Sequence, residues 1–189
     1  VFANNSNGAG DGGALFAGSF SSLLVCNSSF VANSAVGDGG GIANGGQLDV
    51  FNSSFSANRC NIGAAILNTG VATLTSCTVS SNNYAHGGTG IATYGVLFVA
   101  NCTVNLNGVG IGTAGSGIAF LQNSIVASND PGDLYGTNIL SGGYNLIGNG
   151  DGSGLTNGVN NDQVGTAAVP LDPKLGPLDD NGGPPLTPA

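Results

Sequence analysis

A short block of sequence recurs along the chain, and this internal repeat constrains the fold more than any other feature. Each copy closes on an asparagine, and the closing positions advance by 25, 24, 25 and 22 residues (33 to 58, 82, 107 and 129). A repeat of roughly 20 to 50 residues is typical of solenoids and propellers, in which every copy is one structural unit stacked on the next. The chain is therefore expected to be a repeat protein.

Within a copy, apolar residues alternate with polar ones, as in Leu48-Asp-Val50 and Leu97-Phe-Val99. This period of two is typical of strands and not of helices. At about 3.3 Å per residue, three short strands joined by glycine-rich and asparagine-rich corners make one turn of a coil. The sequence therefore predicts an all-β protein, a right-handed parallel β-helix.

Equivalent residues of successive turns stack about 4.8 Å apart, so each inward position of the repeat predicts one column of the core. A shift of one residue in the pairing would expose the apolar side chains of a column to water, so the register is strongly specified. Three inward columns are predicted: Leu23/Leu48/Ala72/Leu97/Ala119, Val25/Val50/Leu74/Val99/Leu121 and Phe30/Phe55/Val79/Val104/Val126. A corner row is predicted in left-handed geometry with its amides in an inward ladder: Asn27, Asn52, Ser76, Asn101 and Asn123.

The composition of the chain argues against nucleic acid and membranes as binding partners. The chain has 189 residues, 41% of them hydrophobic, which is enough for a core, but only 2 basic residues and a formal net charge of -8. Arg59 and Lys174 cannot form the basic patch that nucleic acid or an anionic membrane surface requires. No apolar run approaches the roughly 18 residues of a membrane span. We therefore predict neither nucleic-acid binding nor membrane insertion.

The repeat rhythm ends before the C-terminus. Residues 1–148 are predicted to form the β-helix, and residues 149–189 to form a C-terminal cap or extension of the same domain. Six of the seven prolines lie from Pro170 onward, where the sequence has the composition of loops and short extended pieces. The extension is expected to lie along the coil.

Several C-terminal motifs resemble those of a known family. Gly143-Tyr-Asn-Leu-Ile-Gly148, Asp162-Gln-Val-Gly-Thr166 and the segment from Pro173 to Pro184 resemble the C-terminal signature of bacterial choice-of-anchor Q surface proteins. The glycine-rich and Asn-Ser-Ser-Phe copies resemble repeats of the same proteins and of polymorphic outer-membrane proteins. The resemblance covers nearly the whole chain. It implies a secreted right-handed parallel β-helix on a bacterial surface, usually without an assigned enzymatic activity.

A calcium site is one hypothesis for the start of the extension. Asn149, Asp151 and Ser153 place oxygen ligands at alternate positions and are followed by Gly154, as in the first half of a calcium loop. The twelfth position is Asn160 where such loops need a bidentate glutamate. The candidate Ca²⁺ ligands are therefore Asn149, Asp151, Ser153 and Asp162, and an ordinary polar turn is the alternative.

Asparagine-linked glycosylation is a second hypothesis. The acceptor triplets lie at Asn4, Asn27, Asn52 and Asn101, and they favour an extracellular or cell-surface location. Three of these residues belong to the corner row, so an inward ladder would conflict with attached sugar. Asn4 is outside that row.

Phenylalanines are predicted to line the outside of the coil. The expected outward row is Cys26, Phe51, Thr75, Phe98 and Phe120. A row of exposed phenylalanine is unusual on a soluble monomer. Either the C-terminal segment covers Phe51, Phe98 and Phe120, through Pro170, Leu171, Leu175 and Leu178, or these residues form a contact between subunits.

No catalytic residues are predicted. Asp11 and Asp38 occupy equivalent loop positions one turn apart, as polar turn residues or a cation site, and the single histidine, His86, is expected to be an exposed loop residue. Cys77 and Cys102 share one column, where their spacing permits a disulfide but a reduced stack is the alternative.

The sequence thus favours a non-enzymatic extracellular structural protein of the bacterial surface. Because the open ends of a solenoid present unpaired strands, head-to-tail assembly into a fibre is one hypothesis. An adhesin or glycan-binding module is an alternative, in which Tyr84 and Tyr94 would contact polysaccharide. A polysaccharide lyase or hydrolase is another, although no acidic cluster with a basic residue is predicted on one face.

Overall fold

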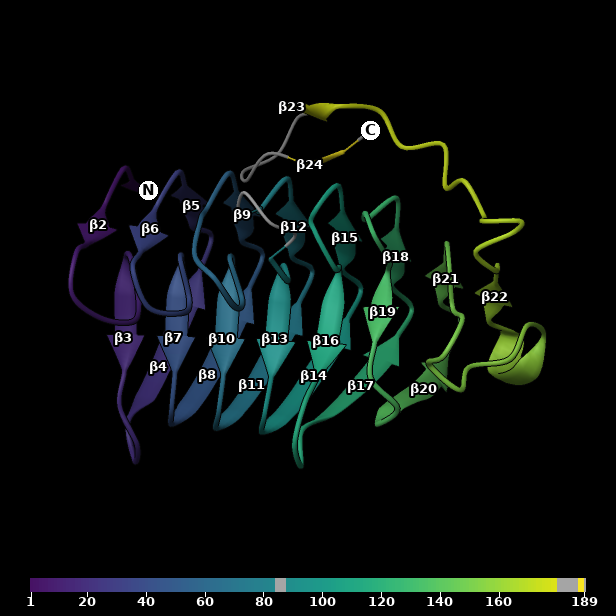
Figure 1. Cartoon of the computed structure of the whole chain (residues 1–189), viewed down its shortest axis with the longest axis horizontal. Coiled ribbons are helices and arrows are strands. Elements are labelled where there is room, and N and C mark those ends of the chain that lie inside the picture. The colour runs from purple at the N-terminus through teal and green to yellow at the C-terminus, as the bar shows by residue number, and fades with distance from the viewer. Residues whose placement is uncertain (84–87, 180–186, 189) are drawn as a thin grey trace.

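The protein is a parallel β-solenoid, as Figure 1 shows for a computed structural model that describes residues 1–83, 88–179 and 187–188. Strands from successive turns pair in parallel, so the sheets run along the axis of the coil. The prediction of an all-β parallel β-helix is confirmed.

Three sheets form the walls of the solenoid. The eight-stranded sheet has the order β1 (Phe2–Ala3), β5 (Ser29–Val31), β9 (Ser54–Ser56), β12 (Thr78–Ser80), β15 (Thr103–Asn105), β18 (Ile125–Ala127), β21 (Leu146–Ile147) and β22 (Gln163–Val164). The short-strand sheet has the order β19 (Leu134–Tyr135), β16 (Ile111–Thr113), β13 (Ile91–Thr93), β10 (Ile66–Asn68), β7 (Ile42–Asn44) and β3 (Leu15–Ala17). The long-strand sheet has the order β20 (Ile139–Gly143), β17 (Ile118–Gln122), β14 (Val96–Ala100), β11 (Val71–Thr75), β8 (Gln47–Phe51) and β4 (Ser22–Cys26).

Smaller elements lie outside these walls. Two strands, β2 (Ser6–Asn7) and β6 (Ser34–Ala35), pair in parallel, and β23 (Leu178–Asp179) pairs with β24 (Thr187–Pro188) in antiparallel fashion. A short 3-10 helix, η1 (Val159–Asn161), follows the last turns and contacts β20.

The predicted inward columns are present in the expected register. The pairings join Leu48 to Ala72, Val50 to Leu74 and Phe55 to Val79, and the neighbouring turns continue each column. A fourth column comes from the residues that end the glycine-rich pieces: Leu15, Ile42, Ile66, Ile91 and Ile111. Nearly all of these side chains are buried, so period-two alternation located the core correctly.

The glycine pairs of the repeat have a steric cause. Gly39 has a φ of 70°, a backbone conformation that costs other residues free energy. At Gly40, a Cβ atom would lie 2.5 Å from the carbonyl oxygen of Ala64 in the next turn. The turns could not approach to strand-pairing distance at this corner with larger residues.

The corner row has the predicted left-handed geometry but faces solvent. Positive φ angles occur at every member: Asn27 (47°), Asn52 (49°), Ser76 (55°), Asn101 (56°) and Asn123 (46°). All five side chains are exposed. Asn52 Nδ2 donates to Asn27 Oδ1 at 2.7 Å, and Asn123 Nδ2 to Asn101 Oδ1 at 2.7 Å, whereas Ser76 interrupts the row. The prediction of an inward ladder here is wrong, because the left-handed residue turns its side chain away from the core.

A buried asparagine ladder lies instead at the closing position of each repeat. Its members are Asn33, Asn58, Asn82, Asn107 and Asn129, all at most 8% exposed. In each step the backbone N–H and Nδ2 of one asparagine both donate to Oδ1 of the next, at 2.8 to 3.1 Å. The last asparagine, Asn129, donates in the same way to Asp133 Oδ1, so the ladder ends on a carboxylate.

A second buried row runs beside it and also ends on a carboxylate. The side chain of each member accepts the backbone N–H of the member one turn earlier. The accepting side chains are Cys102, Ser124, Asn145 and Asp162. A carboxylate suits the end of each row because it only accepts hydrogen bonds. Unlike an asparagine amide, it has no N–H group that would need an acceptor in a further turn.

The C-terminal extension lies along the coil, as predicted, but it does not cover the phenylalanines. In Figure 1 the segment after β22 runs back along the side of the coil that carries β12 and β15. Outward side chains of that eight-stranded sheet, such as Ser80, are buried, whereas Phe51 and Phe98 on the long-strand sheet are 40% and 41% exposed. The extension thus packs along the coil, but over serine and threonine rows rather than over phenylalanine.

Candidate functional site

The outer face of the long-strand sheet carries several exposed apolar side chains, among them Leu24, Phe98 and Leu140. Its middle row consists of Leu24, Asp49, Thr73, Phe98, Phe120 and Leu140. Phe51 pairs with Cys26 and Thr75 instead, and so belongs to a neighbouring row. The predicted single row of Phe51, Phe98 and Phe120 is therefore wrong. Phe98 and Phe120 lie between the two inward residues of their strands, whereas Phe51 follows the second inward residue of its strand. Whether these phenylalanines contact another subunit stays a prediction.

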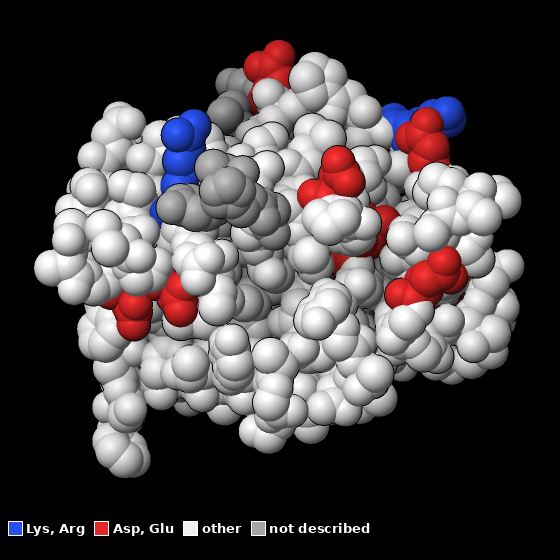
Figure 2. Space-filling model, in the orientation of Figure 1, with Lys and Arg blue, Asp and Glu red and all other residues white. Residues whose placement is uncertain are grey.

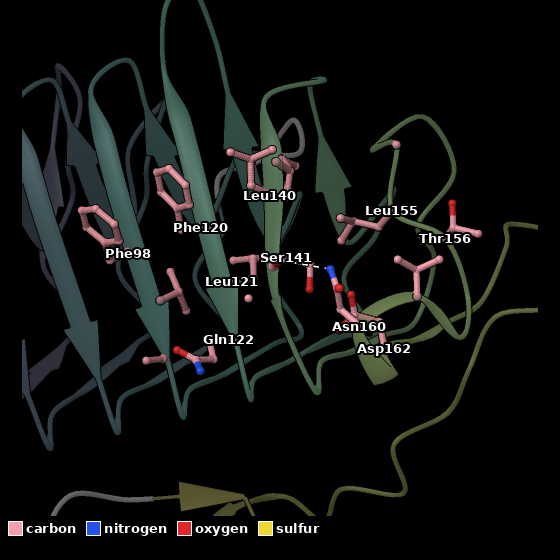
Figure 3. A pocket seen from close by; sticks show the side chains of 16 residues that line it. Phe98, Phe120, Leu121, Gln122, Leu140, Ser141, Leu155, Thr156, Asn160 and Asp162 are labelled. Atoms are coloured by element: carbon pink, nitrogen blue, oxygen red, sulfur yellow. Dashed lines mark hydrogen bonds between the residues drawn. The ribbon is translucent and has the colours of Figure 1, made fainter.

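A groove of about 710 Å³ lies at the C-terminal end of this face. Figure 3 shows Phe98, Phe120 and Leu140 side by side on neighbouring strands, facing Leu155 across the groove. The rings of Phe98 and Phe120 are stacked, with centroids 5.0 Å apart and planes inclined by 12°. Phe98 is 41% exposed and Leu140 49% exposed, so apolar surface is left in contact with solvent.

The second wall of the groove comes from the extension. Residues 154–162 bring Leu155, Val159 and Asn160 opposite the sheet. Two hydrogen bonds fix this segment to β20 and the residue after it: Tyr144 N donates to Asn160 O at 3.0 Å, and Asn160 Nδ2 donates to Ser141 O at 3.3 Å. Figure 3 draws the second of these as a dashed line.

Asp162 is a buried carboxylate that borders the groove. It is 3% exposed, and its Oδ1 accepts hydrogen bonds from Asn145 N at 2.9 Å and Asn145 Nδ2 at 3.0 Å. Its Oδ2 receives no hydrogen bond from the part of the chain that the structure describes. At the end of the other ladder, by contrast, Asp133 Oδ2 accepts from Asn149 N at 2.6 Å.

Ser141 on β20 stacks on Leu121 and so continues an inward column. Its Oγ accepts from Gly143 N at 2.9 Å and from Asn145 Nδ2 at 3.0 Å. Both bonds use oxygen lone pairs, so the hydroxyl hydrogen is left to point toward another acceptor. The groove thus has an apolar floor of outward side chains, and Asp162 is the charged residue among those that line it.

Each of the four candidate calcium ligands makes a hydrogen bond within the chain. Asn149 Oδ1 accepts from Asp151 N at 3.1 Å, and Ser153 Oγ donates to Gly150 O at 2.6 Å, so these side chains close a local turn. Asp151 Oδ2 accepts from Ala167 N at 2.9 Å, while Asp162 ends the second buried row. Within the described residues no group of three or more His, Cys, Asp or Glu side chains could hold a metal ion. Asn149 and Ser153 thus form a polar turn, and a Ca²⁺ site at the four residues stays a prediction.

The four glycosylation candidates all lie at the surface. Asn4, Asn27, Asn52 and Asn101 are exposed, so the conflict expected from an inward ladder does not arise. Asn52 Nδ2, the atom that would carry sugar, donates to Asn27 Oδ1, whereas Asn27 and Asn101 only accept in their pair. Glycosylation stays a prediction at all four.

Asp11 and Asp38 link neighbouring turns. Asp38 N donates to Asp11 Oδ1 at 2.8 Å, and Ile62 N donates to Asp38 Oδ1 at 3.1 Å. Burial raises the pKa of Asp38 above its usual value; the hydrogen bond from Ile62 opposes this, and the charge of Asp11 adds to it. Each carboxylate accepts a hydrogen bond from the backbone of the next turn, which agrees with the turn interpretation.

The cysteines are free thiols. Cys77 N donates to Cys102 Sγ at 3.3 Å, and Cys102 Sγ lies 3.2 Å from Ala100 O, so the pair is part of the second buried row. The side-chain hydrogen bond with Cys77 and burial hold the pKa of Cys102 well above its usual range. Burial likewise raises the pKa of Cys60 to about 11. The Cys60 and Cys102 thiols are therefore protonated at neutral pH.

Charge is dispersed over the surface. Figure 2 shows the two basic side chains at opposite ends of one face, with acidic side chains scattered between them. Lys174 Nζ pairs with Asp172 at 2.6 Å, and this hydrogen bond lowers the pKa of Asp172. None of the helices in the described part of the chain is long and apolar enough to span a membrane.

Comparison with protein-family models, with curated proteins and with solved structures gives no match for this chain. His86 and Tyr84 lie outside the described residues, and Tyr94 is 40% exposed. The sequence did not single out Ser141, Leu140 or Leu155 as site residues. The only available signal was the outward position of Leu140 one turn beyond Phe120, since the extension that completes the groove carries no repeat.

Proposed function

We propose that the protein is a non-enzymatic, extracellular structural module of a bacterial surface, a stiff rod that spaces or displays other segments. The observation that carries this proposal is the buried asparagine ladder, which joins consecutive turns through side-chain as well as backbone hydrogen bonds. Buried polar networks in which every group is paired stiffen a fold. The buried asparagines of this ladder join turns to one another. The bacterial surface location rests on the resemblance of the C-terminal motifs.

Self-association of such rods is the second part of the proposal. β1, β3 and β4 form the N-terminal edges of the three main sheets, and edge strands can pair with another chain. At the opposite end η1 packs against β20, so head-to-tail growth requires this segment to move. We therefore expect weak, concentration-dependent association rather than long fibres at low concentration.

The experiment combines imaging with an activity screen. Electron microscopy of the purified chain should show short, uniform rods that resist proteases, and sedimentation velocity should show a slow rise in average mass with concentration. Incubation with neutral and acidic polysaccharides, with and without Ca²⁺, should release neither reducing ends nor unsaturated products. Product release by the purified chain would favour the lyase or hydrolase alternative. Failure of an antibody to label intact cells that express the full-length protein would contradict the surface location.

A further inference from the structure

The N-terminal end of the coil leaves part of the hydrophobic core uncovered. Three residues of the inward columns are only partly buried here: Phe2, Leu15 and Leu23. The residues that pair with them in the next turn are 0% exposed: Phe30, Ile42 and Leu48. The three partly buried residues lie on β1, β3 and β4, the outermost strands of the wall sheets, and Figure 1 shows β3 at that end of the coil. Burial of such side chains is favourable, so this end suits a further layer of polypeptide.

The inner asparagine ladder also reaches this end, where it begins with an open amide. Asn5 precedes Asn33 in the ladder, because its backbone N–H and Nδ2 both donate to Asn33 Oδ1, at 3.0 and 2.8 Å. The Oδ1 atom of every later asparagine in the ladder accepts two hydrogen bonds from the turn before it. Asn5 is exposed, and its Oδ1 accepts none from the residues that the structure describes. A partner with an N–H pair could donate to it.

The same amide has an unused donor. Asn33 Nδ2 donates to Asn58 Oδ1 and also to the carbonyl oxygen of Phe2 in the turn before, at 2.9 Å each. Asn58 Nδ2 makes the equivalent bond to Phe30 O at 2.9 Å. Within the described part of the chain, Asn5 Nδ2 donates to Asn33 alone, so its second hydrogen is left for a carbonyl oxygen. The fitting partner therefore supplies two donors and one acceptor.

A stack of phenylalanine rings ends at the same place. The rings of Phe2, Phe30 and Phe55 are stacked with centroids 4.7 Å apart and planes inclined by 8° and 7°. Each of these phenylalanines lies three residues before an asparagine of the inner ladder. Phe2 has a ring neighbour on the side of Phe30 only, and aromatic pairs are favourable beyond the area that they bury. A segment with Phe and Asn three residues apart would extend the ring stack and the ladder together.

The C-terminal end of a second copy does not supply these groups. There the ladder ends on the carboxylate of Asp133, which has no N–H to donate. The last two strands of the same sheet, β21 and β22, are followed by Gly150 and Ala167, three residues after Ile147 and Val164. Neither residue has an amide side chain. Simple end-to-end contact of two copies therefore leaves the Asn5 amide unpaired.

We propose that the N-terminal end binds an extended segment of another polypeptide that carries Phe and Asn three residues apart. The segment adds to β1 in parallel, with its Phe ring on Phe2. Its Asn donates through the backbone N–H and Nδ2 to Asn5 Oδ1, and the carbonyl oxygen of its Phe accepts from Asn5 Nδ2. Addition of a strand to an exposed sheet edge is a common mode of peptide recognition. This inference deepens the proposed self-association, on which it rests in that both require these edge strands to be open to another chain.

The test uses a fluorescein-labelled peptide with the sequence of residues 27–35, which contains Phe30 and Asn33. Fluorescence anisotropy during titration with the whole chain should show saturable binding. Asn33→Asp in the peptide keeps the shape of the side chain but removes the Nδ2 donor and places a carboxylate against Asn5 Oδ1. We expect affinity to fall about tenfold or more. The matched control is Asn27→Asp in the peptide, at the solvent-facing corner of the repeat, which should leave affinity unchanged.

Variants of the protein locate the binding site. Asn5→Ala removes the open amide and should weaken binding about tenfold. Asn4→Gly changes the neighbouring exposed asparagine, whose φ of 56° suits glycine, and should leave affinity unchanged. Thermal unfolding of both variants establishes folding. If Asn5→Ala does not fold, the two peptide variants still decide the question, because they leave the protein as it is.

Several results would overturn the inference. These are no saturable binding of the peptide, equal affinity of the Asn33→Asp and Asn27→Asp peptides, or full affinity of a folded Asn5→Ala protein. Release of the labelled peptide as the chain self-associates would make the occupant a second copy instead. Sedimentation velocity separates this inference from the proposed function. Self-association of a chain that binds no peptide would leave that proposal standing alone, and peptide binding by a chain that stays monomeric would support this inference alone.

Discussion

Two asparagine rows run along the coil, one inside and one outside, and they use the same amide for different purposes. In the inner row each amide accepts two hydrogen bonds from the previous turn and donates to the next, as at Asn82. In the outer row Asn52 makes one side-chain bond to Asn27, and Ser76 interrupts the row without harm to the left-handed corner. The inner position therefore requires the amide, whereas the outer one requires only a residue that tolerates positive φ.

Removal of an inner amide is the strongest way to test this difference. Asn82→Ala would leave three buried groups without their hydrogen-bond partner: the backbone N–H and Nδ2 of Asn58 and the carbonyl oxygen of Phe55. Each buried group that loses its partner costs about 1–3 kcal/mol, and the surrounding structure relaxes in part. We therefore expect the free energy of unfolding to fall by about 3–5 kcal/mol. Urea denaturation monitored by circular dichroism measures it. A loss below about 1 kcal/mol would show that the inner ladder is dispensable.

The carboxylate that ends the inner ladder should be the next most sensitive position. In Asp133→Asn, an amide that accepts from Asn129 through Oδ1 would turn its NH₂ group toward Asn149 N, which now donates to Oδ2. Two donors would face each other there. We expect a loss of about 1–2 kcal/mol at pH 7, measured by the same denaturation.

The effect of pH on this variant has a definite sign. Burial raises the pKa of Asp133 above its usual value of 3.8, although hydrogen bonds from Asn129 and Asn149 oppose the shift. The folded state therefore binds the proton more tightly than the unfolded state, so this contribution is full below pH 3.8 and is lost as pH rises through the raised pKa. The stability gap between the natural protein and Asp133→Asn should widen as pH falls. A gap that narrows at low pH would contradict the burial argument.

A member of the second buried row should tolerate a change that keeps its acceptor. Cys102 Sγ accepts from Cys77 N at 3.3 Å, and one turn later Ser124 Oγ accepts from Cys102 N at 3.1 Å. Cys102→Ser keeps the hydrogen bond and exchanges sulfur for a smaller, more polar atom. We expect a loss of about 1 kcal/mol or less by thermal denaturation, with Cys102→Val, which has no acceptor, losing more. Equal losses for the two variants would show that packing alone matters at this position.

The parts of this fold that were predictable from sequence are those that repeat. Alternation placed Leu48 and Val50 in the core, and the glycine pairs marked the tight corner at Gly40, because each rule acts locally and recurs in every turn. The inner ladder was visible as the one position where all five copies keep asparagine, yet asparagine is equally common at turns, so its burial did not follow from residue type. Phe51 was misplaced because it was grouped by residue type rather than counted from the inward positions.

The site was less predictable because half of it does not repeat. Phe98 and Phe120 were recognised as outward phenylalanines, but the groove also needs Leu155 and Asp162 from the extension. That segment has no periodicity, and its path depends on contacts between residues distant in sequence, such as Tyr144 N with Asn160 O. The extension was expected to need an apolar surface, and it packs instead along a side of the coil rich in serine and threonine.

The smallest effect is expected in the outer row, where Asn52→Gly completes the comparison. The change removes one exposed hydrogen bond of 2.7 Å to Asn27 and relieves the cost of a φ of 49° for a residue with a Cβ atom. These effects oppose each other, and exposed hydrogen bonds contribute little because water replaces them, so the unfolding free energy should change by no more than about 0.5 kcal/mol. Asn52→Ala, which loses the bond and keeps the strained φ, should cost about 1 kcal/mol by the same urea denaturation. If Asn52→Gly were as damaging as Asn82→Ala, the outer amides would be structural links as well, and burial would not be what distinguishes the two rows.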